Sequence, residues 1–184
     1  VFGVFQDLTS IRRTEALVDY LSLHDETTDL PNRRLFLRRA AERIQKVRAE
    51  NDRVLLIGTI DIHRFARFNE SLGEGGANRL LALWGQRLKH HQDGGTVVEV
   101  ARVGGDEFAV AIQATDGAAA SAVFRRVQQA LRQPVHLEQQ ELVVPFSAGW
   151  AVCPTHGHEA EPLLTLAQEA QRRARAQGRD DLGA

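Results

Sequence analysis

The sequence predicts an α+β fold, a sandwich in which helices flank a central, mostly antiparallel sheet. Three observations lead to this prediction. Helix and strand patterns interleave along the chain, a short turn that contains glycine joins two strands as a hairpin, and 43% of the 184 residues are hydrophobic, which is enough for a core. The length corresponds to one ordinary domain with a small appendage.

The appendage is the N-terminal end of the chain. Residues 1–9 have the pattern of the end of a strand and its exit, and residues 10–23 have apolar side chains at roughly helical spacing, with Thr9 or Ser10 placed to cap the helix. A helix of this length is marginal alone and needs a partner. The expected partner is the same helix in a second subunit; the alternative is that the helix packs on its own domain.

The first half of the domain alternates helix, strand and helix. An amphipathic pattern predicts a helix over 33–50, and a continuous apolar run predicts a buried strand over 54–60 that ends at Asp61. An irregular stretch with a Gly-rich turn at 73–76 follows, and a further helix is predicted over 77–91.

The second half contains four more strand patterns and two more helix patterns. The strands are predicted at 96–101, 108–112, 135–140 and 141–152. The helices are predicted at 117–132 and 162–177, with Pro162 well suited to a first turn. The first two strands form the hairpin.

Composition and charge exclude several classes of function. The formal net charge is −1, so no global basic field indicates a nucleic-acid partner. The single cysteine, Cys153, rules out an internal disulfide and fits a reducing, cytoplasmic compartment. The sequence has no apolar run near the ~18–20 residues that span a bilayer, and we expect no signal peptide. The chain lacks methionine and begins in the middle of a pattern, so we expect it to be a piece of a longer protein.

Three carboxylates are expected to meet at one edge of the sheet. Asp61 ends an apolar strand, and Asp106 and Glu107 lie at the tip of the hairpin beside Gly104 and Gly105. Carboxylate oxygens are hard ligands that suit magnesium, and glycines let the backbone approach a bulky polyphosphate. The alternative is a solvated hairpin turn and an ordinary strand-end aspartate; convergence of the three side chains favours a site.

Five segments of the chain carry, in order, the motifs of one known family. Residues 24–33, HDETTDLPNR, are similar to HDxLTGLPNR, and residues 61–73, DIHRFARFNESLG, are similar to DIDxFKxxNDxxG. Residues 102–108 read RVGGDEF. Residues 147–149, SAG, match a late strand, and residues 174–179, ARAQGR, are similar to AKxxGR. On these motifs the chain resembles a GGDEF domain, the catalytic module of bacterial diguanylate cyclases.

The resemblance implies a palm-like fold of the nucleotidyl-cyclase type, and it implies a reaction. Members of this family condense two GTP molecules to cyclic di-GMP and pyrophosphate, each subunit of a dimer presenting one nucleotide to the other. The 3′-hydroxyl of one GTP attacks the α-phosphate of the other. Magnesium, or manganese, neutralises phosphate charge and lowers the pKa of the attacking hydroxyl.

The resemblance also implies residue roles by position. The implied metal ligands are Asp61, the carbonyl of Ile62, Asp106 and Glu107, and the implied catalytic residues are Asp106 and Glu107. The implied nucleotide contacts are Phe65, Asn69, Asn78, Gly104, Gly105, Arg175 and Arg179. Among these, Asn69 would contact guanine, backbone amides near Phe65 would cradle the β- and γ-phosphates, and the two arginines would contact phosphate.

Two departures from the family pattern concern the substrate. Asn78 stands where the family usually has an aspartate that accepts two hydrogen bonds from guanine. An amide offers only one acceptor oxygen, so the mismatch is expected to cost ~1–3 kcal/mol. Ala66 stands where the family has a phosphate-contacting lysine. These changes leave two accounts open: a diguanylate cyclase that is weaker or less selective, or a non-catalytic GTP-binding domain that regulates a neighbour. A dimerisation module without a ligand is a third.

Two further segments have patterns associated with binding sites in other proteins. The family often carries an inhibitory product site, RxxD, whose positions correspond to Gly95 and Val98, so the motif is absent and no inhibition through it is expected. Cys153, His156 and His158 share one loop and resemble part of a zinc site, but a fourth ligand is missing and a variable turn is the favoured interpretation.

The predicted domain organisation follows from these resemblances. Residues 1–9 resemble the last strand and exit of a PAS sensor domain, residues 10–23 are a linker helix that pairs two subunits, and residues 24–184 are the GGDEF domain. An upstream PAS sensor and a downstream domain, such as a cyclic di-GMP phosphodiesterase, are the expected neighbours in the same chain. GTP is the expected ligand, with no nucleic acid and no membrane contact for this fragment.

Overall fold

The computed structural model describes residues 18, 20–50, 52–92, 95–137, 139–179 and 181–184. The predicted end of a PAS domain, 1–9, and most of the predicted linker helix, 10–23, lie outside the described residues. Residues 20–23 are helical. None of the helices in the described part of the chain combines the length and the apolar character needed to cross a bilayer.

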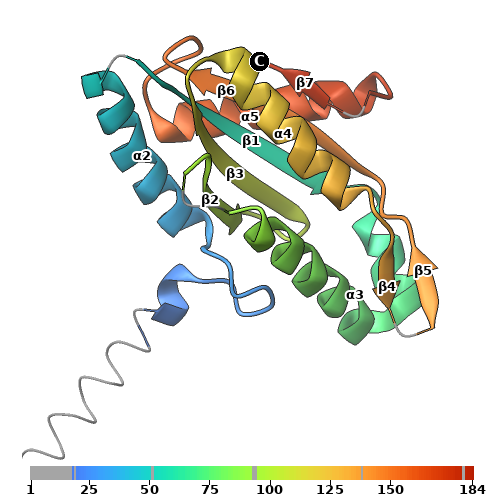
Figure 1. Ribbon diagram of the computed structural model, residues 1–184. Coiled ribbons are helices and arrows are strands. Elements are labelled where there is room, and N and C mark those ends of the chain that lie inside the picture. Colours follow the sequence, from blue (N-terminus) through green and yellow to red (C-terminus); the bar gives the residue numbers. More distant parts are fainter. Residues whose placement is uncertain (1–17, 19, 51, 93–94, 138, 180) are drawn as a thin grey trace, which may run out of the picture.

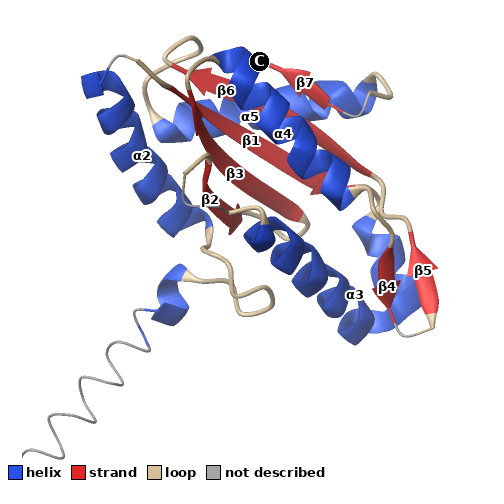
Figure 2. Ribbon diagram, viewed as in Figure 1, coloured by secondary structure: helices blue, strands red, loops and turns tan. Residues whose placement is uncertain are grey.

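The helices and strands alternate as predicted (Figures 1 and 2). The helices are α2 (Arg33–Glu50), α3 (Phe65–His90), α4 (Gly117–Leu131) and α5 (Ala160–Ala176). The strands are β1 (Val54–Ile62), β2 (Val97–Arg102), β3 (Glu107–Ala114), β4 (Val135–Leu137), β5 (Gln140–Leu142), β6 (Phe146–Cys153) and β7 (Asp181–Gly183).

One five-stranded sheet, in the order β2-β3-β1-β6-β7, forms the centre of the molecule. The first four strands pair antiparallel, and only β7 pairs parallel, with β6. The short strands β4 and β5 make a separate hairpin. The predicted α+β architecture, a mostly antiparallel central sheet flanked by helices, is therefore confirmed.

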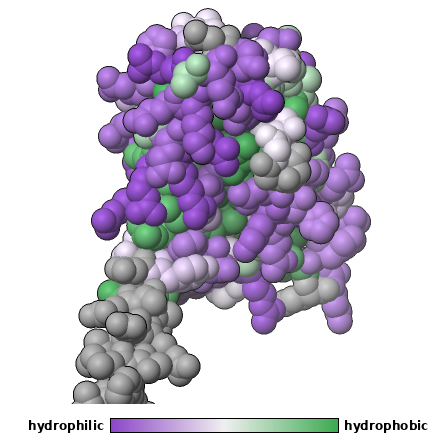
Figure 3. All heavy atoms as spheres, turned by 60° about the vertical axis from the view of Figure 1, so that its left-hand side comes forward, coloured by the Kyte–Doolittle hydropathy of each residue, from purple (hydrophilic) through white to green (hydrophobic). Residues whose placement is uncertain are grey.

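Helices cover both faces of the sheet, because the central strand is apolar on both sides. In β1, Leu56 and Ile60 belong to the core shared with α3 and α4, whereas Leu55 and Ile57 belong to the core shared with α2 and α5. This alternation explains the continuous apolar run of the sequence. The face of the molecule in Figure 3 is mostly hydrophilic, with smaller hydrophobic areas between the polar side chains.

Several predicted boundaries are wrong. Helix α3 begins at Phe65 rather than at residue 77, and the predicted turn at 73–76 is only a break at Gly73, whose φ of 70° and ψ of 170° interrupt the helix. Asp61 lies inside β1, not after it. The predicted strand 141–152 is divided between β5 and β6, and β7 was not predicted.

Helix α5 lies very close to the sheet where it crosses β6. A Cβ atom at Gly149 would fall 2.2 Å from the backbone nitrogen of Gln171 and 2.3 Å from the carbonyl oxygen of Ala167. Only glycine permits this approach, since any side chain would meet helix backbone. The close contact fixes the height of α5 above the sheet and so places its side chains beside the ends of β1 and β3.

Candidate functional site

The register of the sheet brings the three predicted carboxylates together. Strands β1 and β3 run antiparallel, so the end of β1 lies beside the start of β3, and Asp61 pairs directly with Glu107. The backbone amide of Ile62 donates a hydrogen bond to the carbonyl of Asp106 at 3.1 Å. The expectation that Asp61, Asp106 and Glu107 meet at one edge therefore agrees with the structure.

A tight turn of the β2–β3 hairpin presents Asp106. The amides of Val103 and Gly104 both donate to the carbonyl of Glu107, at 2.9 and 3.2 Å. A Cβ atom on Gly104 would lie 3.2 Å from the Cβ of Glu107, whereas one on Gly105 would meet nothing within 4 Å. A side chain at position 104 would therefore crowd that of Glu107, whereas Gly105 faces open space.

Arg102 anchors this turn to the loop that precedes α2. Its Nε donates to the carbonyl of Gly105 at 3.1 Å, and its Nη1 contacts both carboxylate oxygens of Asp25 at 2.9 and 3.0 Å. Burial would raise the pKa of Asp25, but hydrogen bonds from Thr28 and Arg102 outweigh burial and hold that pKa below its ordinary value. No role was predicted for Arg102 or Asp25. Their only signal was that each belongs to a recognised motif.

Asp61 is paired with an arginine of α5. The Nη1 of Arg175 lies 3.0 Å from Oδ1 of Asp61, whose side chain is 20% exposed. The pKa of Asp61 is raised to about 6, chiefly by burial and then by the charges of Asp106 and Glu107, with Arg175 only partly opposing them. The ionised form of Asp61 is thus disfavoured in a site that holds two further carboxylates.

Glu107 is held by a glutamine of the same helix. The Nε2 of Gln168 donates to both carboxylate oxygens of Glu107, at 2.9 and 3.0 Å. Burial raises the pKa of Glu107 above its ordinary value, although the hydrogen bond from Gln168 and the nearby charge of Arg33 act in the opposite direction. Gln168 was not predicted, because no local pattern indicates that it faces a residue 61 positions away in the chain.

An open cleft of about 680 Å³ lies between the hairpin turn that carries Asp106 and helix α3. It brings together five of the predicted site residues, which are Phe65, Asn69, Asn78, Gly105 and Asp106. Its remaining lining residues are Ala66, Glu74, Leu81 and Arg102. Asn69 and Asn78 come from opposite sides of the break at Gly73, so the interruption of α3 lets both line one cleft.

The other predicted contacts lie outside this cleft. Arg175 is directed to Asp61, on the α5 side of the sheet edge. Arg179 is exposed just beyond α5, where its amide donates to the carbonyl of Ala174 at 2.9 Å after Gly178 has reversed the chain with a φ of 64°. The cleft is therefore lined by Asn69 and Asn78, whereas Arg175 contacts Asp61 from α5.

The carboxylates suit a divalent cation by chemistry, although their side chains do not enclose one. Among the described residues, no three or more His, Cys, Asp or Glu side chains are arranged to hold a metal ion. Burial raises the pKa of Asp61 most, and the negative charge of Asp106 raises it further, so a divalent cation bound beside both would lower the cost of holding Asp61 ionised. Hard oxygen donors are what Mg²⁺ and Mn²⁺ prefer.

The loop considered for zinc has a structural explanation. Cys153 is buried at the end of β6, and burial raises the pKa of its thiol. The Nδ1 of His156 accepts a hydrogen bond from the amide of Val152 at 3.0 Å, which shapes the turn. The side chain of His156 therefore stabilises the backbone conformation of the loop.

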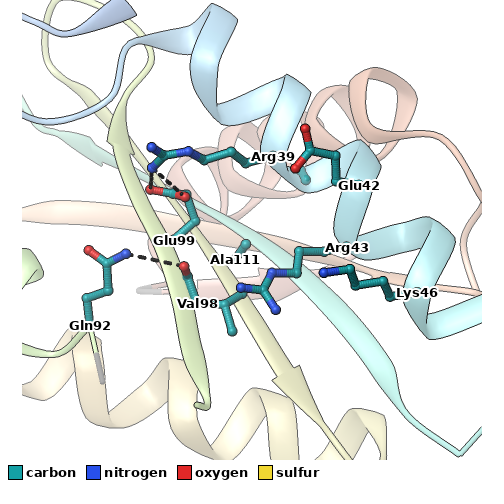
Figure 4. Close-up of a pocket in the computed structure, with 9 residues that line it drawn as sticks. Arg39, Glu42, Arg43, Lys46, Gln92, Val98, Glu99 and Ala111 are labelled. Atoms are coloured by element: carbon teal, nitrogen blue, oxygen red, sulfur yellow. Dashed lines mark hydrogen bonds and ion pairs between the residues drawn. The ribbon is translucent and has the colours of Figure 1, made fainter. Parts of the chain in front are cut away.

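One of the two positions of the product-inhibition motif borders a hollow of about 330 Å³ between α2 and β2 (Figure 4). Val98 lines it, and neighbouring Glu99 is buried and accepts two hydrogen bonds from Arg39, at 3.0 and 2.9 Å. Gly95 is exposed before β2. The hollow is built around the pair of Arg39 and Glu99, which joins α2 to the sheet.

Replacing Asp61 by asparagine is expected to stabilise the fold above about pH 6. The pKa of Asp61 is raised from 3.8 to about 6, so the native state loses stability relative to the unfolded state as the pH rises through this range. Above about pH 6 this loss is complete. We expect Asp61→Asn to raise the free energy of unfolding by about 1–2 kcal/mol near neutral pH. Urea unfolding at about pH 7.5 and about pH 4 measures this, and an equal gain at both would contradict the assigned cause.

Comparisons with known proteins agree with this geometry. The family model described as the GGDEF domain of diguanylate cyclases matches residues 22–181. The chain is 30% identical over 175 residues to the bifunctional diguanylate cyclase/cyclic di-GMP phosphodiesterase MucR of Pseudomonas aeruginosa, covering 94% of this chain and 25% of MucR. It is 31% identical over 160 residues to the diguanylate cyclase DgcP of Escherichia coli, covering 87% of this chain and 44% of DgcP.

Solved structures give the same result. A sensory box/GGDEF protein of Caulobacter crescentus is similar with a TM-score of 0.78 and 32% identity, over 85% of this chain and 99% of that chain. The GGDEF domain of TpbB, or YfiN, of Pseudomonas aeruginosa has a TM-score of 0.79 and 27% identity, over 88% and 94% of the two chains. The chain spans about a quarter of the length of MucR and about a fifth of the phosphodiesterase NbdA, also of Pseudomonas aeruginosa.

Proposed function

The chain belongs to the GGDEF-domain family of diguanylate cyclases, and from this premise we propose that it condenses two molecules of GTP to cyclic di-GMP and pyrophosphate. The observation that supports this most is the pairing of Asp61 with Glu107 beside Asp106, at the mouth of a cleft large enough for a nucleotide base. The proposed reaction uses cytoplasmic GTP, so we place the domain in the cytoplasm.

Each group of residues has a separate task in the proposed reaction. Asn69 and Asn78 bind guanine in the cleft, while the backbone near Phe65, with Arg175 and Arg179, binds the phosphates. Asp61, Asp106 and the carbonyl of Ile62 would hold Mg²⁺ or Mn²⁺. When bound, the cation supplies charge neutralisation at the phosphates and lowers the pKa of the attacking 3′-hydroxyl.

Glu107 acts at the boundary between the cleft and α5. Its carboxylate, oriented by Gln168, is placed to assist at the metal or to accept the proton of the attacking 3′-hydroxyl. A raised pKa makes a carboxylate a better base than an exposed one, because the ideal catalytic pKa lies nearer to neutral pH. Gly104 and Gly105 keep side chains away from the phosphates.

The reaction needs two domains, because each contributes one nucleotide. Apolar side chains of the described end of the N-terminal helix are exposed, namely Val18 at 60%, Tyr20 at 44% and Leu21 at 49%. We propose that this helix pairs with its copy in a second subunit, which would cover these side chains. An upstream PAS sensor would act through the same helix.

A second function is favoured by two residues of the cleft. Asn78 and Ala66 both line it, and neither offers the acceptor pair or the cation expected for tight binding of GTP. In this alternative, the domain binds GTP without turnover and regulates a neighbouring domain. Phosphodiesterases among the relatives, MucR and NbdA, suggest which kind of neighbour.

Product formation from GTP and Mg²⁺ tests the two proposals. The chain, with residues 1–23 retained to allow pairing, is incubated at high concentration, and the nucleotides are separated by chromatography, with ATP as the matched substrate. Cyclic di-GMP in the GTP reaction supports the cyclase. Absence of product, with GTP binding detected by calorimetry, supports the regulatory alternative. Absence of both contradicts each of them.

A further inference from the structure

Two side chains of α5 face the carboxylate edge, and each of them holds one carboxylate. Gln168 and Arg175 are seven residues apart, which is about two helical turns and therefore one face of the helix. Gln168 donates to both oxygens of Glu107, and Arg175 contacts Oδ1 of Asp61 at 3.0 Å. The helix thus neutralises or satisfies the acids that the reaction would use.

Asp61 requires a counter-ion whenever no metal is present. A carboxylate that is 20% exposed and close to two further acids is costly to bury without a compensating cation. Arg175 meets this need from the solvent side, because its own side chain is 46% exposed. Its guanidinium can therefore leave Asp61 without disturbing the packing of α5, which depends on the buried Ala167, Ala170 and Ala174.

We propose that Arg175 is an exchangeable counter-ion, which occupies Asp61 until a divalent cation binds there and then moves to the phosphates of the nucleotide. The two cations compete for Asp61, because a guanidinium and a metal ion at the same carboxylate repel each other. The released guanidinium matches phosphate oxygens with paired N–H donors. Metal binding and phosphate binding become coupled, and the coupling is reciprocal.

This role has a signature that a merely structural arginine would not produce. Removal of the charge at position 175 takes away the competitor of the metal, so affinity for the metal alone should rise. The same change takes away a phosphate contact, so affinity for the nucleotide should fall. A structural arginine would weaken both through damage to the site. The phosphate half of the inference rests on the proposed function, and the metal half does not.

Mn²⁺ alone is the probe for the metal half. Arg175→Gln is compared with Arg173→Gln, which removes the same charge from an exposed position of the same helix, with no contact to Asp61 among the interactions of the described residues. Free and bound Mn²⁺ are measured by electron paramagnetic resonance without nucleotide. We expect Arg175→Gln to bind Mn²⁺ about threefold to tenfold more tightly than the wild type, and Arg173→Gln to stay within about twofold.

The phosphate half uses calorimetric titration of GTP with Mg²⁺. Arg175→Gln should bind GTP about fivefold to thirtyfold more weakly than the wild type, whereas Arg175→Lys, which keeps the charge, should recover part of the loss. Circular dichroism and urea unfolding establish that each variant is folded. If Arg175→Gln does not fold, the same comparison is made with Arg175→Lys. The ammonium of this variant should release Asp61 more readily than the guanidinium does, so the variant protein should bind Mn²⁺ more tightly than the wild type.

The outcomes separate this inference from the proposed function. Equal or weaker Mn²⁺ binding by Arg175→Gln relative to Arg173→Gln overturns the counter-ion role, and so does undetectable Mn²⁺ binding in all variants. Tighter Mn²⁺ binding by Arg175→Gln, in a protein that does not bind GTP, supports the counter-ion and contradicts the proposed function. Tighter Mn²⁺ binding together with weaker GTP binding supports the whole exchange.

Discussion

Replacing Asp106 by asparagine is expected to reduce the formation of cyclic di-GMP by at least about a hundredfold. Asparagine keeps the size of the side chain and leaves unchanged the backbone bond from Ile62 to the carbonyl of residue 106. It removes one of the carboxylates expected to hold the divalent cation. The hairpin should therefore stay folded while the charge that attracts Mg²⁺ to the phosphates is lost.

The matched control for this change is an aspartate at the other end of β3. Asp116 follows β3 and caps α4 by accepting a hydrogen bond from the amide of Ala119 at 2.7 Å, and asparagine is an equally good cap. Asp116→Asn should keep its activity within about twofold of the wild type. Product formation is measured by chromatography, and Mg²⁺-dependent GTP binding by calorimetry. If Asp106→Asn keeps both its product formation and its Mg²⁺-dependent GTP binding, Asp106 is not a ligand of the proposed metal site.

The carboxylate edge could be predicted from sequence because each part has a local signal. The apolar run before Asp61 marks a buried strand, and the glycines before Asp106 mark a tight turn between two strands. Once both strands are placed in one antiparallel sheet, only their adjacency is left to assume. The structure supplies it through the pairing of β1 with β3.

The boundaries around the site were less predictable, because the local signals are misleading there. Three glycines between 73 and 76 indicate a turn, yet only Gly73 leaves the helical conformation and α3 continues on both sides of it. The apolar run stops at Ile60, but strand pairing depends on backbone hydrogen bonds and continues through Asp61 to Ile62. The hydrophobic pattern therefore predicts where an element lies in the chain more reliably than it predicts where the element ends.

The partners that orient the acids could not be predicted from local patterns. Gln168 contacts Glu107 across a sequence separation of 61 residues, and Arg102 contacts Asp25 across 77. These pairs depend on how closely α5 and the loop before α2 approach the sheet. For α5 that distance is set by Gly149, whose missing side chain admits the helix backbone. A polar residue on an amphipathic helix has no sequence signal that distinguishes such a contact from exposure to solvent.

Replacing Asn78 by aspartate is expected to increase the affinity for GTP about tenfold to a hundredfold, and to increase selectivity for GTP over ATP by a similar factor. Asn78 lines the cleft beside Asn69, on the far side of the break at Gly73. Guanine presents two adjacent N–H donors, and a carboxylate can accept both, whereas an amide can accept only one and turns a donor toward the other. Adenine does not present this pair of donors, so its nucleotide should not gain. Calorimetric titration of both nucleotides with Mg²⁺ measures the change.

The matched control is Asn69→Asp, which introduces the same carboxylate in the same cleft from the other part of α3. If only the added negative charge mattered, both variants would change nucleotide affinity alike, and the anionic phosphates would make that change a loss. A gain confined to Asn78→Asp places guanine recognition at this position.

If that variant also forms cyclic di-GMP while the wild type forms none, the wild-type domain retains the reactive site and lacks a competent base contact. That result would favour the regulatory alternative. A gain in affinity without product in either protein would shift attention to Ala66, where a cation for the phosphates is missing.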